Sequence, residues 1–141
     1  MLFRNEYYFL SNMYPCKISC EINGKQYNFK CSEAAFQAHK APSRAKEFEN
    51  IDGFTAKKLG RTVRMEISNW DNIKDNIMKK CLHAKFQQNP ELMDKLKSTH
   101  NVHICEENTW HDTYWGVCNG RGQNKLGKML MEIRDNKTTD P

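Results

Sequence analysis

Two acidic side chains stand where a carboxylate could face a ligand. Glu33 opens a predicted helix directly after a predicted strand, and Asp112 lies in the aromatic run from Trp110 to Gly116. Cleavage of a glycosidic bond passes through an oxocarbenium-like state. It needs a carboxylate near the anomeric carbon or its attacking water, and usually an acid for the leaving group. Because the chain has 17 acidic residues, finding two in such positions is weak evidence by itself. A helix cap or a surface charge is the alternative role for each of them.

A glycine-rich stretch follows the second carboxylate and leads into the last predicted helix. Gly116 and Gly122 would let backbone N–H groups approach an anion, and Asn124 is placed to cap the helix, so the stretch resembles a phosphate cradle. It fits neither the Walker pattern nor G-x-G-x-x-G, whose last glycine would fall on Lys125. A flexible connection between two elements is the alternative interpretation.

Aromatic and basic side chains could complete a site for a nucleotide-like anion. Trp70 and Trp115 could each stack on a heterocycle, a contact of about 1–3 kcal/mol, although core packing is the commoner role of an aromatic. Basic residues near the end of a short predicted helix could clamp phosphate or form a solvated surface: Lys57, Arg61 and Arg64. The net charge of +5 suits an anionic small ligand or a weak attraction to nucleic acid, and not a dedicated nucleic-acid binder. A solvated basic surface without a partner is the alternative, and on charge alone it is favoured.

The histidines and cysteines indicate neither a metal site nor another cofactor. None of the five histidines has the spacing of metal ligands, and the six cysteines form no C-x-x-C pair. We therefore predict no metal and no cofactor. The cysteines are expected to be reduced, mostly as small buried side chains, and no local sequence supports a catalytic cysteine.

The elements that must position these residues begin with a hairpin. Apolar positions alternate from Ile18 to Ile22 and again from Tyr27 to Cys31, and Asn23-Gly24 lies between the two runs. Asn-Gly favours a type I′ turn, which needs positive φ at both central residues. A two-residue loop places Ile18 opposite Phe29, so that one apolar face of the hairpin must pack on helices.

Helices are predicted from caps and from apolar spacing. Ser32 should cap a helix that runs toward Lys40, and Gly60 should close a short helix that begins near Thr55. A long helix should follow Trp70, and Pro90 should open the next one. Three further elements are expected: a short helix at 43–48, a strand at 102–105 and a last helix after Asn124 with an apolar stripe of Leu126, Met129, Leu130 and Ile133.

These elements predict an α+β fold, helix-rich, with a small antiparallel sheet. The length fits a single domain over 1–141, with a frayed polar tail at 136–141. The chain has no apolar run of about 18 residues and no secretory signal. We therefore expect a cytoplasmic protein that has no membrane partner and requires no protein partner.

Five sequence blocks, taken in order from Phe9 to Arg134, resemble the NADAR family, also called the YbiA-like family. The first three are Phe9-Leu10-Ser11-Asn12-Met13-Tyr14-Pro15, Ser32-Glu33-Ala34-Ala35-Phe36-Gln37-Ala38-His39-Lys40, and Ala56-Lys57-Lys58-Leu59-Gly60-Arg61 with Arg64 and Trp70. The fourth is Ala84-Lys85-Phe86-Gln87-Gln88-Asn89-Pro90-Glu91-Leu92. The last is Asp112-Thr113-Tyr114-Trp115-Gly116 with Gly122, Asn124, Leu126-Gly127, Leu130-Met131 and Arg134. Each block alone is weak evidence, whereas five in the right order are specific.

The resemblance implies an N-glycosidase of a phosphorylated ribosyl or ADP-ribosyl substrate. Family substrates include ribosylamino-pyrimidine intermediates of riboflavin synthesis and ADP-ribosyl-guanine in nucleic acid. By position, Glu33 and Asp112 are the implied catalytic residues. The implied substrate-binding residues are Asn12, Lys57, Arg61, Arg64, Trp70, Trp115, Gly116, Gly122 and Asn124. A non-catalytic module that binds ADP-ribose or an NAD derivative is the main alternative, and a nucleic-acid adaptor without a small-molecule pocket is a third.

Overall fold

The computed structural model describes residues 1–136, whose contacts form two compact units. Among these residues, one unit comprises 12–90, and the other combines 1–11 with 91–136. The predicted helix-rich α+β fold with a small antiparallel sheet is confirmed. The single domain predicted for 1–141 stays a prediction, and the frayed tail expected at 136–141 lies, beyond Asn136, outside the described residues. Among the described helices, none is long and apolar enough to cross a membrane.

The unit of residues 12–90 begins with the predicted hairpin. Strands β1 (Ile18–Ile22) and β2 (Lys25–Phe29) pair antiparallel, and Ile18 lies opposite Phe29 as expected. Asn23 and Gly24 have φ of 50° and 82°, which confirms the two-residue turn with positive φ at both positions. The turn chemistry therefore sets the register of the sheet.

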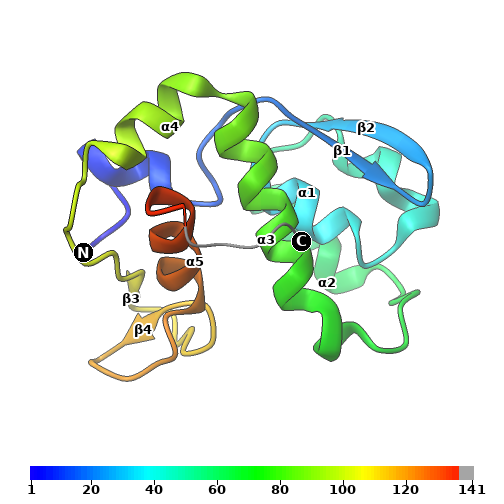
Figure 1. Ribbon diagram of the computed structural model, residues 1–141. Helices are drawn as coiled ribbons and strands as arrows, with labels where there is room; N and C mark the ends of the chain where they lie inside the picture. The colour runs from blue at the N-terminus through cyan, green and yellow to red at the C-terminus, as the bar shows by residue number, and fades with distance from the viewer. Residues whose placement is uncertain (137–141) are drawn as a thin grey trace. The chain divides into compact units, whose positions relative to one another are not determined.

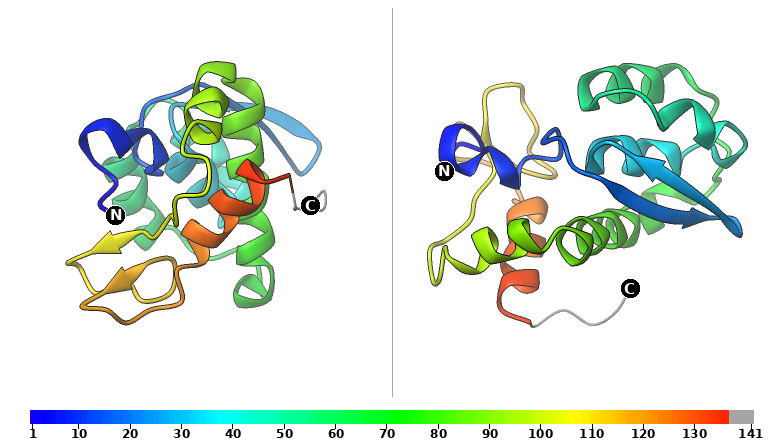
Figure 2. Two further views of the ribbon diagram at one scale, coloured as in Figure 1. Left: turned by 60° about the vertical axis from the view of Figure 1, so that its left-hand side comes forward. Right: turned by 90° about the horizontal axis from the view of Figure 1, so that it is seen from above.

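Helices α1 (Ser32–Ala38) and α3 (Trp70–Gln88) pack against this hairpin (Figure 1). The view from above in Figure 2 shows the two strands as a ribbon that extends alongside α1. Ser19 of β1 is tied to the end of α3, because its N–H donates to Oε1 of Gln88 at 2.7 Å and its carbonyl accepts from Nε2 at 2.9 Å. The apolar face of the hairpin is buried through Ile18, Cys20, Ile22 and Phe29.

The start of α1 differs from the prediction, because Ser32 does not cap it. Cys31 occupies the N-cap position without a side-chain cap bond. The Ser32 hydroxyl donates instead to Oδ1 of Asn12 at 2.8 Å, and the backbone carbonyl of Asn12 accepts from the Glu33 N–H at 3.0 Å. Asn12, which lies 21 positions before Glu33, thus accepts an N–H group of the first helical turn. The sequence around α1 does not predict this long-range hydrogen bond.

Helix α2 (Gly53–Thr62) also differs from the prediction, because Gly60 lies inside it and does not end it. Asp52 caps the helix by accepting the Thr55 N–H at 2.8 Å. The missing side chain at Gly60 admits α1, since a Cβ there would collide with Oε1 of Gln37. A close approach between two helices therefore explains a glycine that resembles a helix terminator. The short helix expected at 43–48 is the 3₁₀ helix η2 (Pro42–Phe48).

The other unit contains η1 (Asn5–Leu10), α4 (Pro90–Lys97), α5 (Lys125–Arg134) and a pair of two-residue strands. Pro90 opens α4 as predicted, and the apolar stripe of α5 is buried as predicted. The strand expected at 102–105 is wrong. The chain pairs later, where β3 (Glu107–Asn108) lies parallel to β4 (Val117–Cys118).

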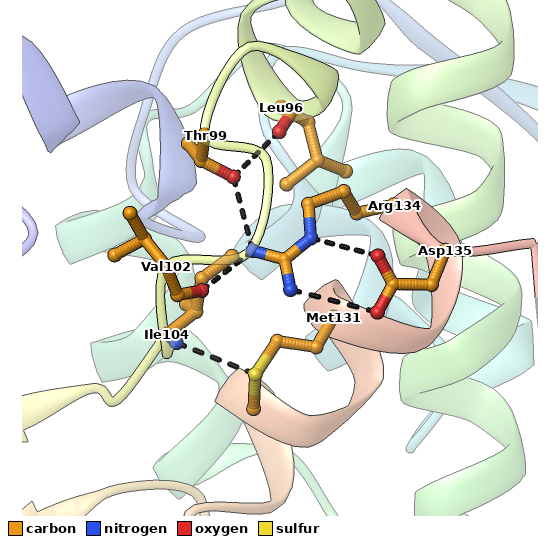
Figure 3. Close-up of polar contacts among 7 residues, drawn as sticks. All are labelled: Leu96, Thr99, Val102, Ile104, Met131, Arg134 and Asp135. Carbon is orange, nitrogen blue, oxygen red and sulfur yellow. Dashed lines mark hydrogen bonds and ion pairs between the residues drawn. The ribbon is translucent and has the colours of Figure 1, made fainter.

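Arg134, at the end of α5, ties the segment after α4 to that helix (Figure 3). Its Nη1 donates to Oγ1 of Thr99 at 3.1 Å and to the carbonyl of Val102 at 2.6 Å, and its Nε donates to Asp135 at 2.9 Å. A guanidinium that fills its donors in this way stabilises an irregular backbone. Arg134 therefore stabilises the segment between Thr99 and Val102 against α5.

Candidate active site

Glu33 lies in the first turn of α1 and is more than nine-tenths buried, with 8% of its surface exposed. Gln37, one turn further along the same helix, donates from Nε2 to Oε2 of Glu33 at 2.7 Å. The Asn12 segment holds the other end of this turn through Ser32 and the Glu33 N–H. A buried carboxylate of this kind is suited to act on a proton or on a developing positive charge.

A lysine that the sequence analysis did not single out joins this carboxylate. Lys40 follows α1, and its pKa is lowered by burial, while the Glu33 carboxylate opposes the shift and the cations Arg61 and Lys74 add to it. The Lys40 ammonium lies 5.9 Å from the centre of the Trp70 ring. Lys40 lies seven positions after Glu33 and two beyond the last residue of α1, so no helical spacing in the sequence predicted their approach.

Trp70 begins α3 and stands beside α1. Its ring centre lies 5.3 Å from that of Phe36, at an interplanar angle of 54°, and the residue is half-buried. Packing against Phe36 thus covers part of the Trp70 ring surface. The Lys40 ammonium lies within cation–π range of the same ring. Because Lys40 is also within electrostatic range of Glu33, we place Trp70 in one cluster with Glu33.

The three basic residues predicted to hold phosphate all belong to the unit of residues 12–90. Arg61 lies in the last turn of α2, is exposed, and is close enough to lower the pKa of Lys40. Lys57 is half-buried one helical turn earlier, and Arg64 is exposed just after the helix. The structure thus connects Arg61 to the Glu33 and Lys40 cluster by electrostatics. It shows no such link for Lys57 or Arg64 among the interactions of the described residues.

A neutral histidine supports α1 behind this cluster. Burial lowers the pKa of His39 to about 4, with Lys80 adding to the shift and the backbone carbonyl of Ala35 opposing it. Because a carbonyl only accepts, Nδ1–H donates to Ala35 at 2.7 Å, and Nε2 then accepts from the Lys80 ammonium at 3.0 Å. His39 therefore braces the end of α1 in its uncharged form.

Lys85 of α3 is a second buried base that the sequence analysis passed over. It is completely buried, and burial lowers its pKa to about 8 against the opposing effect of Cys16 and Cys31. Its ammonium lies 5.8 Å from the ring centre of Tyr14 and 5.3 Å from that of Phe86. All six cysteines are free thiols. Within residues 1–136, no three His, Cys, Asp or Glu side chains are grouped as metal ligands.

Asp112 belongs to the other unit and caps its own loop. Its Oδ1 accepts the N–H groups of Tyr114 at 3.1 Å and Trp115 at 2.9 Å. Its backbone is fixed by Asn108, whose amide donates to the Asp112 carbonyl at 2.9 Å and accepts from its N–H at 3.1 Å. The capping role considered for Asp112 is therefore present, and its catalytic role stays a prediction.

Trp115 packs against its neighbour Tyr114 in this loop. The two ring centres lie 4.8 Å apart at 83°, an edge-to-face pair. The Lys125 ammonium stands 4.6 Å from the Tyr114 ring centre, and the Lys125 Nζ donates to the tyrosine hydroxyl at 3.3 Å. Trp115 is half-buried, so its predicted contact with substrate stays a prediction.

The glycine-rich stretch is a second hairpin turn. Cys118 and Arg121 exchange both backbone hydrogen bonds, at 2.8 and 3.0 Å, around Asn119 and Gly120 with φ of 53° and 76°. Five backbone N–H groups here donate to protein carbonyls, those of Val117, Cys118, Arg121, Gln123 and Asn124. These five amides are therefore occupied within the protein, and the phosphate cradle predicted at Gly116 and Gly122 stays a prediction. Asn-Gly, which predicted the first turn correctly, was also the signal for this one.

Gly116, Gly122 and Asn124 serve the packing of this loop. A Cβ at Gly122 would collide with the Gly116 carbonyl oxygen, and one at Gly116 would collide with Oε2 of Glu106. Asn124 occupies the predicted N-cap position of α5, but its side chain makes no cap hydrogen bond. Its amide instead accepts the Glu106 N–H at 2.9 Å and donates to the Ile104 carbonyl at 3.0 Å.

Glu106 is a buried acid that was not among the predicted site residues. It is 9% exposed, and its Oε2 accepts from Nδ2 of Asn108 at 2.9 Å. The Asn108 amide also holds Asp112. Asn108 thus links Glu106 to Asp112. The fold of the loop brings these two acids together, and the sequence alone does not show it.

Comparison with known proteins places the chain among enzymes. The profile of the NADAR domain matches residues 2–136. The chain belongs to the NADAR family. N-glycosidase YbiA of Shigella boydii serotype 4 (strain Sb227) is 35% identical over 120 residues, which cover 82% of this chain and 73% of that protein. The NMR structure of the E. coli protein YbiA has a TM-score of 0.79 and 30% identity, and the match covers 96% of this chain and 83% of that one.

Another NADAR relative is described as a riboflavin biosynthesis protein, VVA0006 of Vibrio vulnificus (strain YJ016). It is 30% identical over 90% of this chain and 35% of that protein. At the level of the family, the chain is a hydrolase that acts on N-glycosyl bonds. The fold expected from the resemblance is confirmed by the YbiA structure.

Proposed function

We propose that this NADAR protein hydrolyses the N-glycosidic bond of a phosphorylated ribosyl or ADP-ribosyl substrate. The observation that carries the proposal is a cluster of groups around α1. The buried Glu33 carboxylate is within electrostatic range of Lys40, whose ammonium lies 5.9 Å from the Trp70 ring centre and within electrostatic range of Arg61. An acid, an aromatic ring and cations are the groups that a phosphorylated N-riboside requires. The names of the relatives, N-glycosidase and riboflavin biosynthesis protein, support the same substrate class.

Glu33 acts at the anomeric carbon in this proposal. As the C–N bond breaks, its electron pair leaves with the heterocycle nitrogen or amine, and positive charge grows on the ribose. The Glu33 carboxylate stabilises that charge and accepts a proton from the water whose oxygen bonds to the carbon. The departing nitrogen takes up a proton, so the products are the free base or amine and a ribose that carries its phosphate.

Lys40 and Arg61 bind the phosphate in this proposal. Burial has already lowered the pKa of Lys40, so a phosphate beside it would stabilise its charged form. Arg61 is exposed at the end of α2, where its guanidinium can pair with two phosphate oxygens. Trp70 offers its remaining surface to the ribose or the base.

A substrate panel followed by mass spectrometry tests the proposal. Oligonucleotides that carry ADP-ribosyl-guanine and the ribosylamino-pyrimidine phosphate of riboflavin synthesis are incubated with the protein, and the released base, amine and sugar phosphate are quantified. Turnover of either one supports the proposal and names the substrate. Tight binding of ADP-ribose without release of product from any member would establish the binding-module alternative.

Glu33→Gln separates catalysis from binding in the same assay. Glutamine keeps the size of the side chain and the chance of a hydrogen bond with Gln37 but removes the charge. We expect turnover to fall about 10²–10⁴-fold, while ADP-ribose affinity measured by calorimetry changes little. Unchanged turnover by a folded Glu33→Gln protein would exclude the role given to Glu33.

A further inference from the structure

Gln37 carries a feature that helix packing alone does not explain. Its side chain is buried at 6% exposure. Within residues 1–136, its Oε1 is buried and accepts no hydrogen bond. Buried acceptors without a donor are unfavourable and rare in native proteins. The unsatisfied Gln37 oxygen therefore needs an explanation, and a functional role is one.

The orientation of the Gln37 amide follows from the Glu33 carboxylate. Nε2 donates to Oε2 of Glu33 at 2.7 Å. If the amide nitrogen and oxygen were exchanged, two acceptor oxygens would face each other, and the bond to an ionised carboxylate would be lost. The structure therefore keeps the Gln37 oxygen unsatisfied and the Glu33 oxygen satisfied.

Gly60 of α2 closes the other side of the amide. A Cβ at this position would collide with Oε1 of Gln37 and would stand 2.7 Å from its Cδ. Because Gln37 is buried between the two helices, its amide has little room to rotate. The glycine thus admits the amide and confines it against Glu33.

We propose that Gln37, held in place by Gly60, is a positioning residue that anchors one carboxylate oxygen of Glu33 for hydrolysis of the N-glycosidic bond. The inference rests on the catalytic role proposed for Glu33. The N–H of Gln37 holds the carboxylate through Oε2 and so restrains its orientation toward the water or the anomeric carbon. It also favours the ionised form, in which a carboxylate can accept a proton.

Other groups act on Glu33 in addition to Gln37, and the experiment holds them constant. Lys40, just after α1, is a cation within electrostatic range of Glu33, and Arg61 of α2 and Lys74 of α3 act on Lys40 in turn. The thiols of Cys31, before α1, and Cys81, on α3, are also within electrostatic range of the carboxylate. Substitution of Gln37 changes none of these.

Gln37→Met is the central variant, because methionine has a similar length but cannot donate. With the substrate found in the panel, we expect kcat to fall about 10- to 100-fold, the effect of losing a hydrogen bond to a charged group, with little change in KM. The acid limb of the rate profile should move to higher pH by about one unit, because the ionised carboxylate has lost a donor. Gly60→Ala should shift the limb in the same direction, since the added Cβ displaces the amide.

Gln88→Met is the matched control. Gln88 makes two side-chain hydrogen bonds, both to the backbone of Ser19. It lies at the far end of α3 from Trp70, so its loss should affect stability and leave the pH profile unchanged. Thermal denaturation of each variant reports purely structural damage. A Gln37→Met protein with wild-type kcat and an unshifted acid limb would overturn the inference.

The Glu33→Gln variant distinguishes failure of the inference from failure of the proposed function. Inactive Glu33→Gln together with fully active Gln37→Met leaves the function standing and removes Gln37 from it. Fully active Glu33→Gln removes both. If both roles hold, Gln37→Met should cost no further activity in the Glu33→Gln background, because the two side chains act as one unit.

Discussion

Replacement of His39 by glutamine should remove a defined part of the acid sensitivity of the protein. Burial lowers the pKa of His39 to about 4 from the ordinary 6.5, so the folded protein binds fewer protons at this site than the unfolded chain between those values. The contribution of the neutral ring is complete above about pH 6.5 and is lost as the pH falls toward 4. A difference of about 2.5 units corresponds to about 3 kcal/mol at most, of which about 2 kcal/mol disappears between pH 7 and pH 5.

Urea titrations at pH 7 and pH 5 measure this effect as the free energy of unfolding. The wild type should lose about 2 kcal/mol more than His39→Gln over this interval, because every other titrating group is common to both proteins. His103→Gln is the matched control, since His103 is exposed, and it should behave as the wild type does. Equal losses for the wild type and His39→Gln, within about 0.5 kcal/mol, would refute the reasoning.

Three further predictions concern the loops, a helix cap and the proposed anion site. Gly122→Ala should cost more than about 3 kcal/mol in urea unfolding, because φ is +150° and a Cβ would lie 2.9 Å from the Cα of Val117. Gly120→Ala, with φ of +76° and no atom within 4 Å of a Cβ, should cost about 1 kcal/mol. Asp52→Ala should destabilise the protein at pH 7. The Thr55 backbone and side chain lower the pKa of Asp52 from 3.8, so the difference should begin to shrink near pH 3.8 and go on shrinking as the pH falls through the lower pKa of the folded state. Lys40→Met should raise KM about 10-fold where the exposed Lys58→Met leaves it unchanged.

Local sequence chemistry by itself determined much of the secondary structure. Asn23-Gly24 specified both the first turn and the register of β1 with β2, because its backbone preference needs no help from the rest of the chain. The apolar stripe of α5 and the start of α4 at Pro90 were also predictable locally. Helical periodicity and the fixed φ of proline each act within one element. The motif blocks determined the family, and with it the fold and the class of reaction.

Only the tertiary structure decided which side chains meet. Gly60 resembles a helix end in sequence, yet it lies inside α2 because Gln37 of another helix needs the space. Asn12 replaces a local cap on α1. Asn124 is the N-cap residue of α5, but its side chain bonds to the Glu106 and Ile104 backbone and not to the helix. Lys40, just beyond α1, is within electrostatic range of Glu33, of Arg61 on α2 and of Lys74 on α3. Turn and helix preferences act between neighbours in the chain, whereas close approaches and buried hydrogen bonds depend on distances between segments, which no local pattern encodes.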